Sequence, residues 1–134
     1  MDQRNIIRWT AVLGALSVGL GAFGAHGLET LVTPDRLEIF HTGVRYSFYH
    51  TFALGLAAAL YPSPSVDTRR LAASVWLWLI GTLLFSGSLY LLSLREVHGL
   101  PVGFLGPVTP IGGLLLIGGW ISLFFSPTKN AASV

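Results

Sequence analysis

The chain has 134 residues, of which 52% are hydrophobic and only 10% are charged. A soluble domain usually has about 25% charged residues, so this composition excludes an ordinary soluble protein and indicates a membrane protein. The formal net charge of +2 is too small to predict nucleic-acid binding, and it fits charges on membrane-facing loops. The absence of cysteine excludes disulfide bonds, thiolate catalysis and iron–sulfur clusters. A chain of this length predicts one domain, residues 1–134.

The first predicted membrane span covers about residues 7–27, where only His26 is ionisable beyond Trp9. His26 is expected at the membrane interface, where it either bonds the last helical carbonyls or contacts His41, Arg45 or a ligand. Small residues recur three or four positions apart in this span and predict a smooth face for close helix packing. These residues are Gly14, Ser17, Gly21 and Gly24.

The second predicted span covers about residues 37–61, within the stretch that combines charge, histidine, aromatic residues and a long apolar run. Thr33 suits the N-cap of this helix and Pro34 its first turn. A continuous helix of about 28 residues would be roughly 42 Å long, which exceeds a bilayer core of about 30 Å. Its first turns are therefore expected in the headgroup region, and the part after Arg45 is expected to go inward.

Two pairs in this helix have i,i+4 spacing, His41 with Arg45 and Tyr46 with His50. Together they predict a polar strip, which in lipid must face protein or water. One interpretation is a seam of hydrogen bonds between helices. The other is a polar pocket that binds a small molecule or carries a proton. The candidate pocket residues are His26, His41, Arg45, Tyr46, His50 and Thr109.

The third predicted span covers about residues 71–94, and Trp76 and Trp78 near its start are expected to anchor it at the interface. The fourth covers about residues 106–126, with Thr109 expected as N-cap and Pro110 as the first helical residue. Because this helix would be short, an earlier start near Phe104 with a kink, or an irregular segment shielded from lipid, is the alternative. Two glycines seven residues apart in this span predict another packing face, Gly112 and Gly119.

These spans predict an all-α bundle of four transmembrane helices, with an interfacial extension at the start of the second. The chain ends would then share one side of the membrane. That side carries Arg4, Arg8, Arg69, Arg70 and Lys129, and the other side carries Arg36, Arg45 and Arg95. The excess of basic residues predicts cytoplasmic termini. We expect the membrane to be a bacterial inner membrane.

The sequence lacks the common catalytic and nucleotide-binding motifs, GxGxxG, the P-loop, HExxH and the nucleophile elbow. All six acidic residues lie outside the spans or at their edges, which argues against a carboxylate-based ion pump. We therefore expect no enzyme, no catalytic residue, no metal site and no resident cofactor.

Four segments, GAFGAHGLE, TGVRYSFYHTFAL, FSGSLYLLSL and LGPVTPIGGLLLIGGW, resemble the signature segments of the YgdD/transmembrane protein 256 family, a domain of unknown function numbered 423. They occur in order and cover about residues 6–125. The resemblance implies a small four-helix membrane protein without an established activity. It identifies as typical positions Gly24, His26, Gly27, Arg45, Tyr46, His50, Gly87, Thr109, Pro110, Gly112, Gly113 and Trp120. The loop between Leu94 and Leu105 looks longer than in the family.

Two functions remain open at this point. The first is a non-enzymatic accessory or assembly subunit that packs against other membrane proteins or lipid. The second is a membrane protein that handles a small molecule, a pigment or a proton through the candidate pocket, in which Arg45 would hold an anion and His50 a proton or cofactor.

Overall fold

The structure is a computed structural model that describes residues 1–128, and the regular structure in this part of the chain is helical apart from one isolated β-bridge. The all-α prediction is therefore confirmed. In chain order the elements are α1 (Gln3–His26), α2 (Pro34–Leu60), α3 (Thr68–Ser93), α4 (Arg95–His98), the 3₁₀ helix η1 (Gly103–Leu105) and α5 (Val108–Phe124). Lys129, which was assigned to the basic side, lies outside the described residues.

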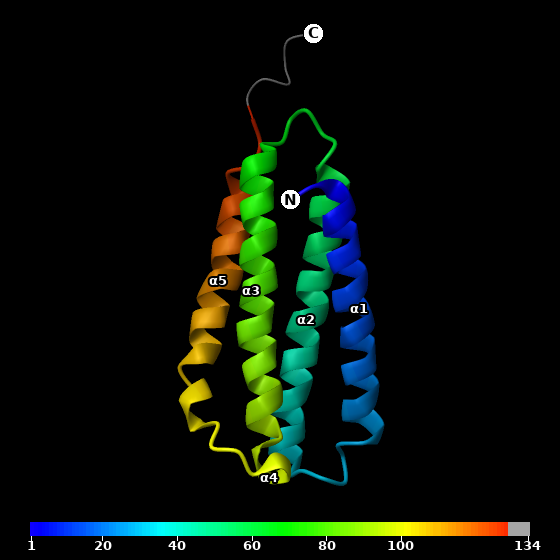
Figure 1. The fold of residues 1–134 in the computed structure, drawn as a ribbon, viewed down its shortest axis with the longest axis vertical. Coiled ribbons are helices and arrows are strands. Elements are labelled where there is room, and N and C mark those ends of the chain that lie inside the picture. The colour runs from blue at the N-terminus through cyan, green and yellow to red at the C-terminus, as the bar shows by residue number, and fades with distance from the viewer. Residues whose placement is uncertain (129–134) are drawn as a thin grey trace.

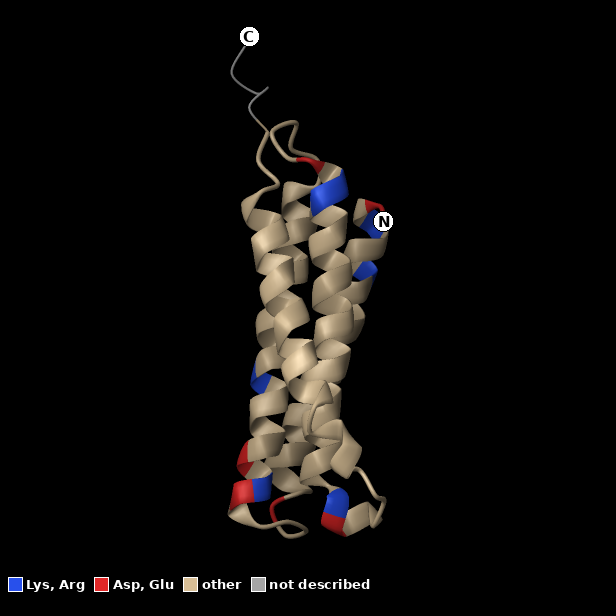
Figure 2. Cartoon of the chain, turned by 90° about the vertical axis from the view of Figure 1, so that its left-hand side faces the viewer, with Lys and Arg blue, Asp and Glu red and all other residues tan. Residues whose placement is uncertain are grey.

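The four long helices run up and down side by side in the order α1, α2, α3, α5 (Figure 1). Helix α1 packs on α2, α2 packs on α3, and α3 packs most extensively on α5. By their backbone contacts the helices therefore form an open layer in which α1 and α5 are the edges. The layer is folded, so that His50 of α2 also lies beside Trp120 of α5. Figure 2 shows that the charged residues gather towards the two ends of this layer.

Three stretches of the described chain are long and apolar enough to cross a membrane: Gln3–His26, Thr68–Ser93 and Gly103–Phe124. Helix α2 is longer than any of them but is too polar to qualify on composition. The prediction of a helical membrane protein is therefore supported by three stretches that could cross a membrane. A fourth crossing by α2 stays a prediction.

The helix starts agree with the sequence in α2 and differ from it in α5. Thr33 is the N-cap of α2 and Pro34 follows it, although the Thr33 side chain makes no capping hydrogen bond. The predictions of Thr109 as N-cap and of Pro110 as the first helical residue are wrong, because α5 begins at Val108 after Pro107. The 3₁₀ helix η1 precedes α5 and leads the chain into it. This arrangement resembles the alternative prediction, in which the helix starts earlier, near Phe104, with a kink.

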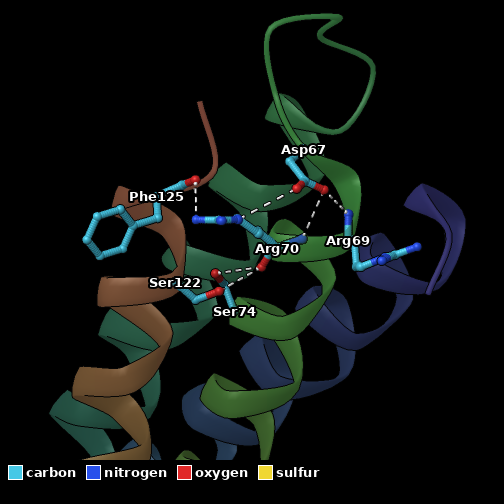
Figure 3. Close-up of polar contacts among 6 residues, drawn as sticks. All are labelled: Asp67, Arg69, Arg70, Ser74, Ser122 and Phe125. Carbon is cyan, nitrogen blue, oxygen red and sulfur yellow. Dashed lines mark hydrogen bonds and ion pairs between the residues drawn. The ribbon is translucent and has the colours of Figure 1, made fainter. Parts of the chain in front are cut away.

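A set of hydrogen bonds ties the start of α3 to the end of α5 (Figure 3). The Asp67 backbone N–H donates to the Ser126 carbonyl at 2.8 Å, and the Arg70 guanidinium donates to the Phe125 carbonyl at 3.0 Å. The Ser122 hydroxyl donates to the Arg70 carbonyl at 2.9 Å. These contacts fix the register of the α3–α5 pair at the end where the chain begins.

The larger apolar core lies between α1, α2, α3 and α5 and includes Ile6, Leu54, Leu71, Trp78 and Leu116. Trp78 is fully buried, so its expected role as an interfacial anchor is wrong, whereas Trp76 is half exposed. Because α3 is apolar on every side, its sequence does not show which face turns inward. The neighbouring helix sets the rotation of α3 and so decides which of the two tryptophans is buried. A smaller core cluster of Leu28, Phe40 and Val44 lies near the other end of the layer.

Candidate functional site

The small residues of α1 lie along its contact with α2. A Cβ added at Gly24 would come within 3.0 Å of the Phe40 ring. The hydroxyl oxygens of Ser17 and Ser47 are 2.6 Å apart across the same interface. Two further positions of the stripe, Gly14 and Gly21, also contact α2 side chains closely. The structure thus places all four small residues at one helix–helix seam.

The approach of α5 to α3 is still closer. A Cβ added at Gly112 would lie 2.5 Å from the Phe85 backbone nitrogen, and one at Gly119 would collide with the Trp78 ring. Sequence reasoning missed Gly81 on α3, where a Cβ would lie 2.7 Å from a Leu116 methyl group. No periodic pattern on α3 marks Gly81, so its role becomes visible only when α5 is in place.

Arg45, a member of the candidate pocket, is engaged at the outer surface of α2. Its guanidinium forms an ion pair with Glu38 and donates to the Thr42 hydroxyl at 2.9 Å. The hydrogen bond that Arg45 donates to Glu38, and then the positive charge of Arg45, lower the pKa of the Glu38 carboxyl from its ordinary value. The partner of Arg45 therefore lies seven residues earlier on its own helix, towards the charged end of the layer.

His50 and Tyr46 lie together where α2 faces α3 and α5. The His50 Nδ1 is 2.8 Å from the Tyr46 carbonyl oxygen, and the Tyr46 ring packs on Phe85 with ring centres 4.6 Å apart. His50 is 5% exposed, and its Nε2 has no hydrogen-bond partner among the described residues. The indole of Trp120 lies on the same side, 6.3 Å from the imidazole centre.

The remaining candidates lie elsewhere. His26 is exposed at the end of α1, whereas His41 packs against α1 near Gly24. The Thr109 hydroxyl is 2.7 Å from that of Ser88, which joins α5 to α3. The six candidates are therefore spread over several places and are not gathered into one pocket. Ligand binding by any of them stays a prediction.

A groove of about 390 Å³ lies between α1 and α3, with part of α2 as its floor. Its walls are mainly leucine, valine and tryptophan side chains, with Trp9 and Leu20 on α1, Trp76 and Leu83 on α3, and Ser47 on α2. None of the six candidate pocket residues lines it. Sequence reasoning missed this groove because it arises from the spatial order of the helices, in which α1 and α3 flank α2.

Three hydroxyl groups of α3 border the groove and are buried without a hydrogen-bond partner among the described residues: those of Thr82, Ser86 and Tyr90. Gly43 on α2 makes room for the Tyr90 ring, because a Cβ there would lie 2.7 Å from it. No group of three or more potential metal ligands occurs in residues 1–128.

The comparisons with known proteins find other membrane proteins. The family model described as "Protein of unknown function (DUF423)" matches residues 20–113. A UPF0382 membrane protein of Haemophilus influenzae is 43% identical over 128 residues, which cover 96% of this chain and 97% of that protein. YwdK, a UPF0382 membrane protein of Bacillus subtilis, is 40% identical over 119 residues, covering 89% and 92%.

The UPF0382 inner membrane protein YgdD of Escherichia coli is 36% identical over 127 residues, which cover 90% of this chain and 86% of that protein. No solved structure matches. The family model covers well over half of the chain, and its relatives match nearly the whole length. The protein therefore belongs to the DUF423 family of membrane proteins.

Proposed function

We propose that this protein is a four-span, non-enzymatic accessory protein of the bacterial inner membrane that acts by packing against another membrane protein. Three observations support the proposal: the length of α2, the charges at the two ends of the layer, and the polar groups on the outer face of α2. The last of these carries the functional part of the argument.

Helix α2 suits the role of fourth crossing. From Arg45 to Tyr61 it rises by about 24 Å, so Arg45 would lie a few ångströms inside a core of about 30 Å. Glu38 would lie about 10 Å nearer the surface on the same helix. A long arginine side chain can extend towards the surface, and the ion pair with Glu38 holds the Arg45 guanidinium in that direction.

The distribution of charge favours cytoplasmic termini. The end where α1 and α3 begin carries Arg4, Arg8, Arg69 and Arg70 against two carboxylates, Asp2 and Asp67. The opposite end carries three arginines against four carboxylates. Arginine-rich ends face the cytoplasm in most inner-membrane proteins.

The outer face of α2 carries polar groups that lipid tails do not satisfy. We call Arg45, Tyr49 and the exposed side of the Tyr46 ring the α2 strip; the other side of that ring packs on Phe85. Tyr46 is 39% exposed and Tyr49 is 56% exposed, and their rings pack edge to face with centres 5.7 Å apart. Hydrocarbon offers no hydrogen-bond partner to a phenol. Tyrosine and arginine are also enriched at protein–protein interfaces, so a polar partner helix is the neighbour that suits this strip.

A photocrosslinking amino acid at Tyr49 tests the proposal in membranes of the native host. The matched control position is Leu114 on α5, which is 68% exposed and does not belong to the α2 strip. We expect one stoichiometric protein adduct from position 49 and only lipid adducts from position 114. Lipid adducts alone at both positions would refute a protein partner on the α2 strip.

The buried imidazole of His50 favours a second function, in which the protein binds a small molecule or relays a proton. Its Nδ1 lies against the Tyr46 carbonyl, which leaves Nε2 as an unused hydrogen-bond acceptor at the junction of α2, α3 and α5. A visible absorption band in the purified protein that disappears in His50→Phe would favour a bound pigment. A colourless protein whose Tyr49 adduct survives His50→Phe would favour the accessory function.

A further inference from the structure

We propose that the groove between α1 and α3 holds one acyl chain of an anionic phospholipid, whose phosphate is bound at the groove's mouth by Arg8 and Arg69. The inference rests on the membrane insertion contained in the proposed function, and it concerns a different face of the molecule from the α2 strip.

The dimensions of the groove suit a single hydrocarbon chain. Its lining runs from Trp9 to Leu20 on α1 and from Trp76 to Tyr90 on α3, which corresponds to lengths of about 16 and 21 Å. The groove has a volume of about 390 Å³ along this length. It is therefore a long, narrow space that suits an extended hydrocarbon chain.

The walls suit the same occupant. Leucine, isoleucine, valine and tryptophan side chains form most of the lining. Gly87 adds a shallow place where a Cβ would meet nothing within 4 Å. The oxygens of Thr82 and Ser86 are buried behind these side chains. The surface that a ligand would touch is therefore apolar along the length of the groove.

Two arginines stand at the end of the groove where α1 and α3 begin. Arg69 precedes the lining residue Trp76 by seven positions, and Arg8 precedes Val12 by four, so each arginine lies on the face of its helix that lines the groove. Both are exposed. In Figure 3 the Arg69 side chain extends away from Arg70, on the side of α3 where α1 lies.

The acidic residues at this end do not neutralise the two arginines. Asp67 pairs with Arg70 at 3.7 Å and caps α3, and Asp2 caps α1 by accepting from the Asn5 backbone N–H. In residues 1–128 no ion pair joins Arg8 or Arg69 to a carboxylate. Guanidinium groups bind phosphate through paired hydrogen bonds, and basic residues at the cytoplasmic surface attract anionic lipids. A phosphate above an acyl chain matches both the charge at the mouth and the apolar groove below it.

Fluorescence quenching in vesicles tests this inference on the purified full chain. Two sets of phosphatidylcholine vesicles are compared. One contains a small fraction of phosphatidylglycerol with brominated chains, and the other contains the same fraction of phosphatidylcholine with brominated chains. Bromine in the groove would quench Trp9 and Trp76, which line it. We expect stronger quenching by phosphatidylglycerol, and each of Arg8→Gln and Arg69→Gln should reduce that preference about fivefold. Arg95→Gln is the matched control, because Arg95 is exposed at the opposite end of the layer.

Filling the groove provides the second arm. Gly87→Leu should abolish the preference, whereas Gly19→Leu should preserve it, because Gly19 also has open space around its Cβ position but does not line the groove. Circular dichroism checks that both variants remain helical, and if Gly87→Leu does not fold the arginine variants alone decide. Equal quenching by the two lipids, or a preference unchanged in the double arginine variant, would overturn the inference. Crosslinking at Tyr49 in the same variants reports separately on the proposed function.

Discussion

The close approach of α5 to the α3 backbone at Gly112 gives a sharp test of the structure. A methyl group added at Gly112 would lie 2.5 Å from the Phe85 backbone nitrogen and 2.8 Å from its Cα. Comfortable carbon contacts are about 3.5–4.0 Å, so α3 and α5 would have to separate by roughly 1 Å. Because the obstacle is backbone, no change of rotamer relieves it. We expect Gly112→Ala to lower the free energy of unfolding by about 1–3 kcal/mol.

The neighbouring glycine provides the control. A Cβ at Gly113 would lie 3.7 Å from the Phe85 ring, which is an ordinary contact. Gly113→Ala should therefore be neutral, or stabilising by up to about 1 kcal/mol, because alanine loses less backbone entropy in a helix. Reversible unfolding in mixed micelles with increasing dodecyl sulfate, followed by circular dichroism, measures both variants. Equal stability of the two variants would refute the close packing of α3 on α5.

The same assay tests three further predictions. Thr82→Val should stabilise the protein by about 1 kcal/mol, because it replaces a buried hydroxyl that has no partner with a methyl group; a loss of stability would mean that the hydroxyl is paired. Gly43→Ala should destabilise it, because the new Cβ would lie 2.7 Å from the Tyr90 ring, and an unchanged transition would contradict that contact. The ion pair with Arg45 lowers the Glu38 pKa below the ordinary glutamate value of 4.5. The contribution of this ion pair to the stability of the fold is therefore present at neutral pH, and it is lost as the pH falls from 4.5 through the folded-state pKa of Glu38. Glu38→Gln should remove that pH dependence, and a transition that keeps it would assign the dependence to another group.

Features that depend on one helix alone were predictable from the sequence. The small-residue stripe that contains Gly14 and Gly24 follows from local spacing, and it faces α2 in the structure. The Thr33–Pro34 start of α2 follows from capping preferences that act within one turn. Membership of an all-helical membrane class follows from composition.

Features that depend on how helices are ordered and rotated were not predictable in this way. The i,i+4 spacing placed Arg45 beside His41, yet its guanidinium turns to Glu38 because an arginine in an apolar span reaches for the charged surface. Trp78 became core because Gly119 of α5 opens a space for its ring. The groove has no local signature at all, since it is a consequence of α1 and α3 flanking α2.

The edge position of α1 has a consequence for how the molecule opens. Helix α1 packs on α2, and only 11% of its apolar window is buried, against 33% for α3. Fewer buried contacts mean a smaller free energy for local opening, so α1 is the helix expected to detach first while α2, α3 and α5 remain assembled. Its amides would then exchange with solvent deuterium sooner than those of α3. In such an opened state the Ser17–Ser47 hydrogen bond would be broken, and the Ser47 hydroxyl would become available to an incoming helix.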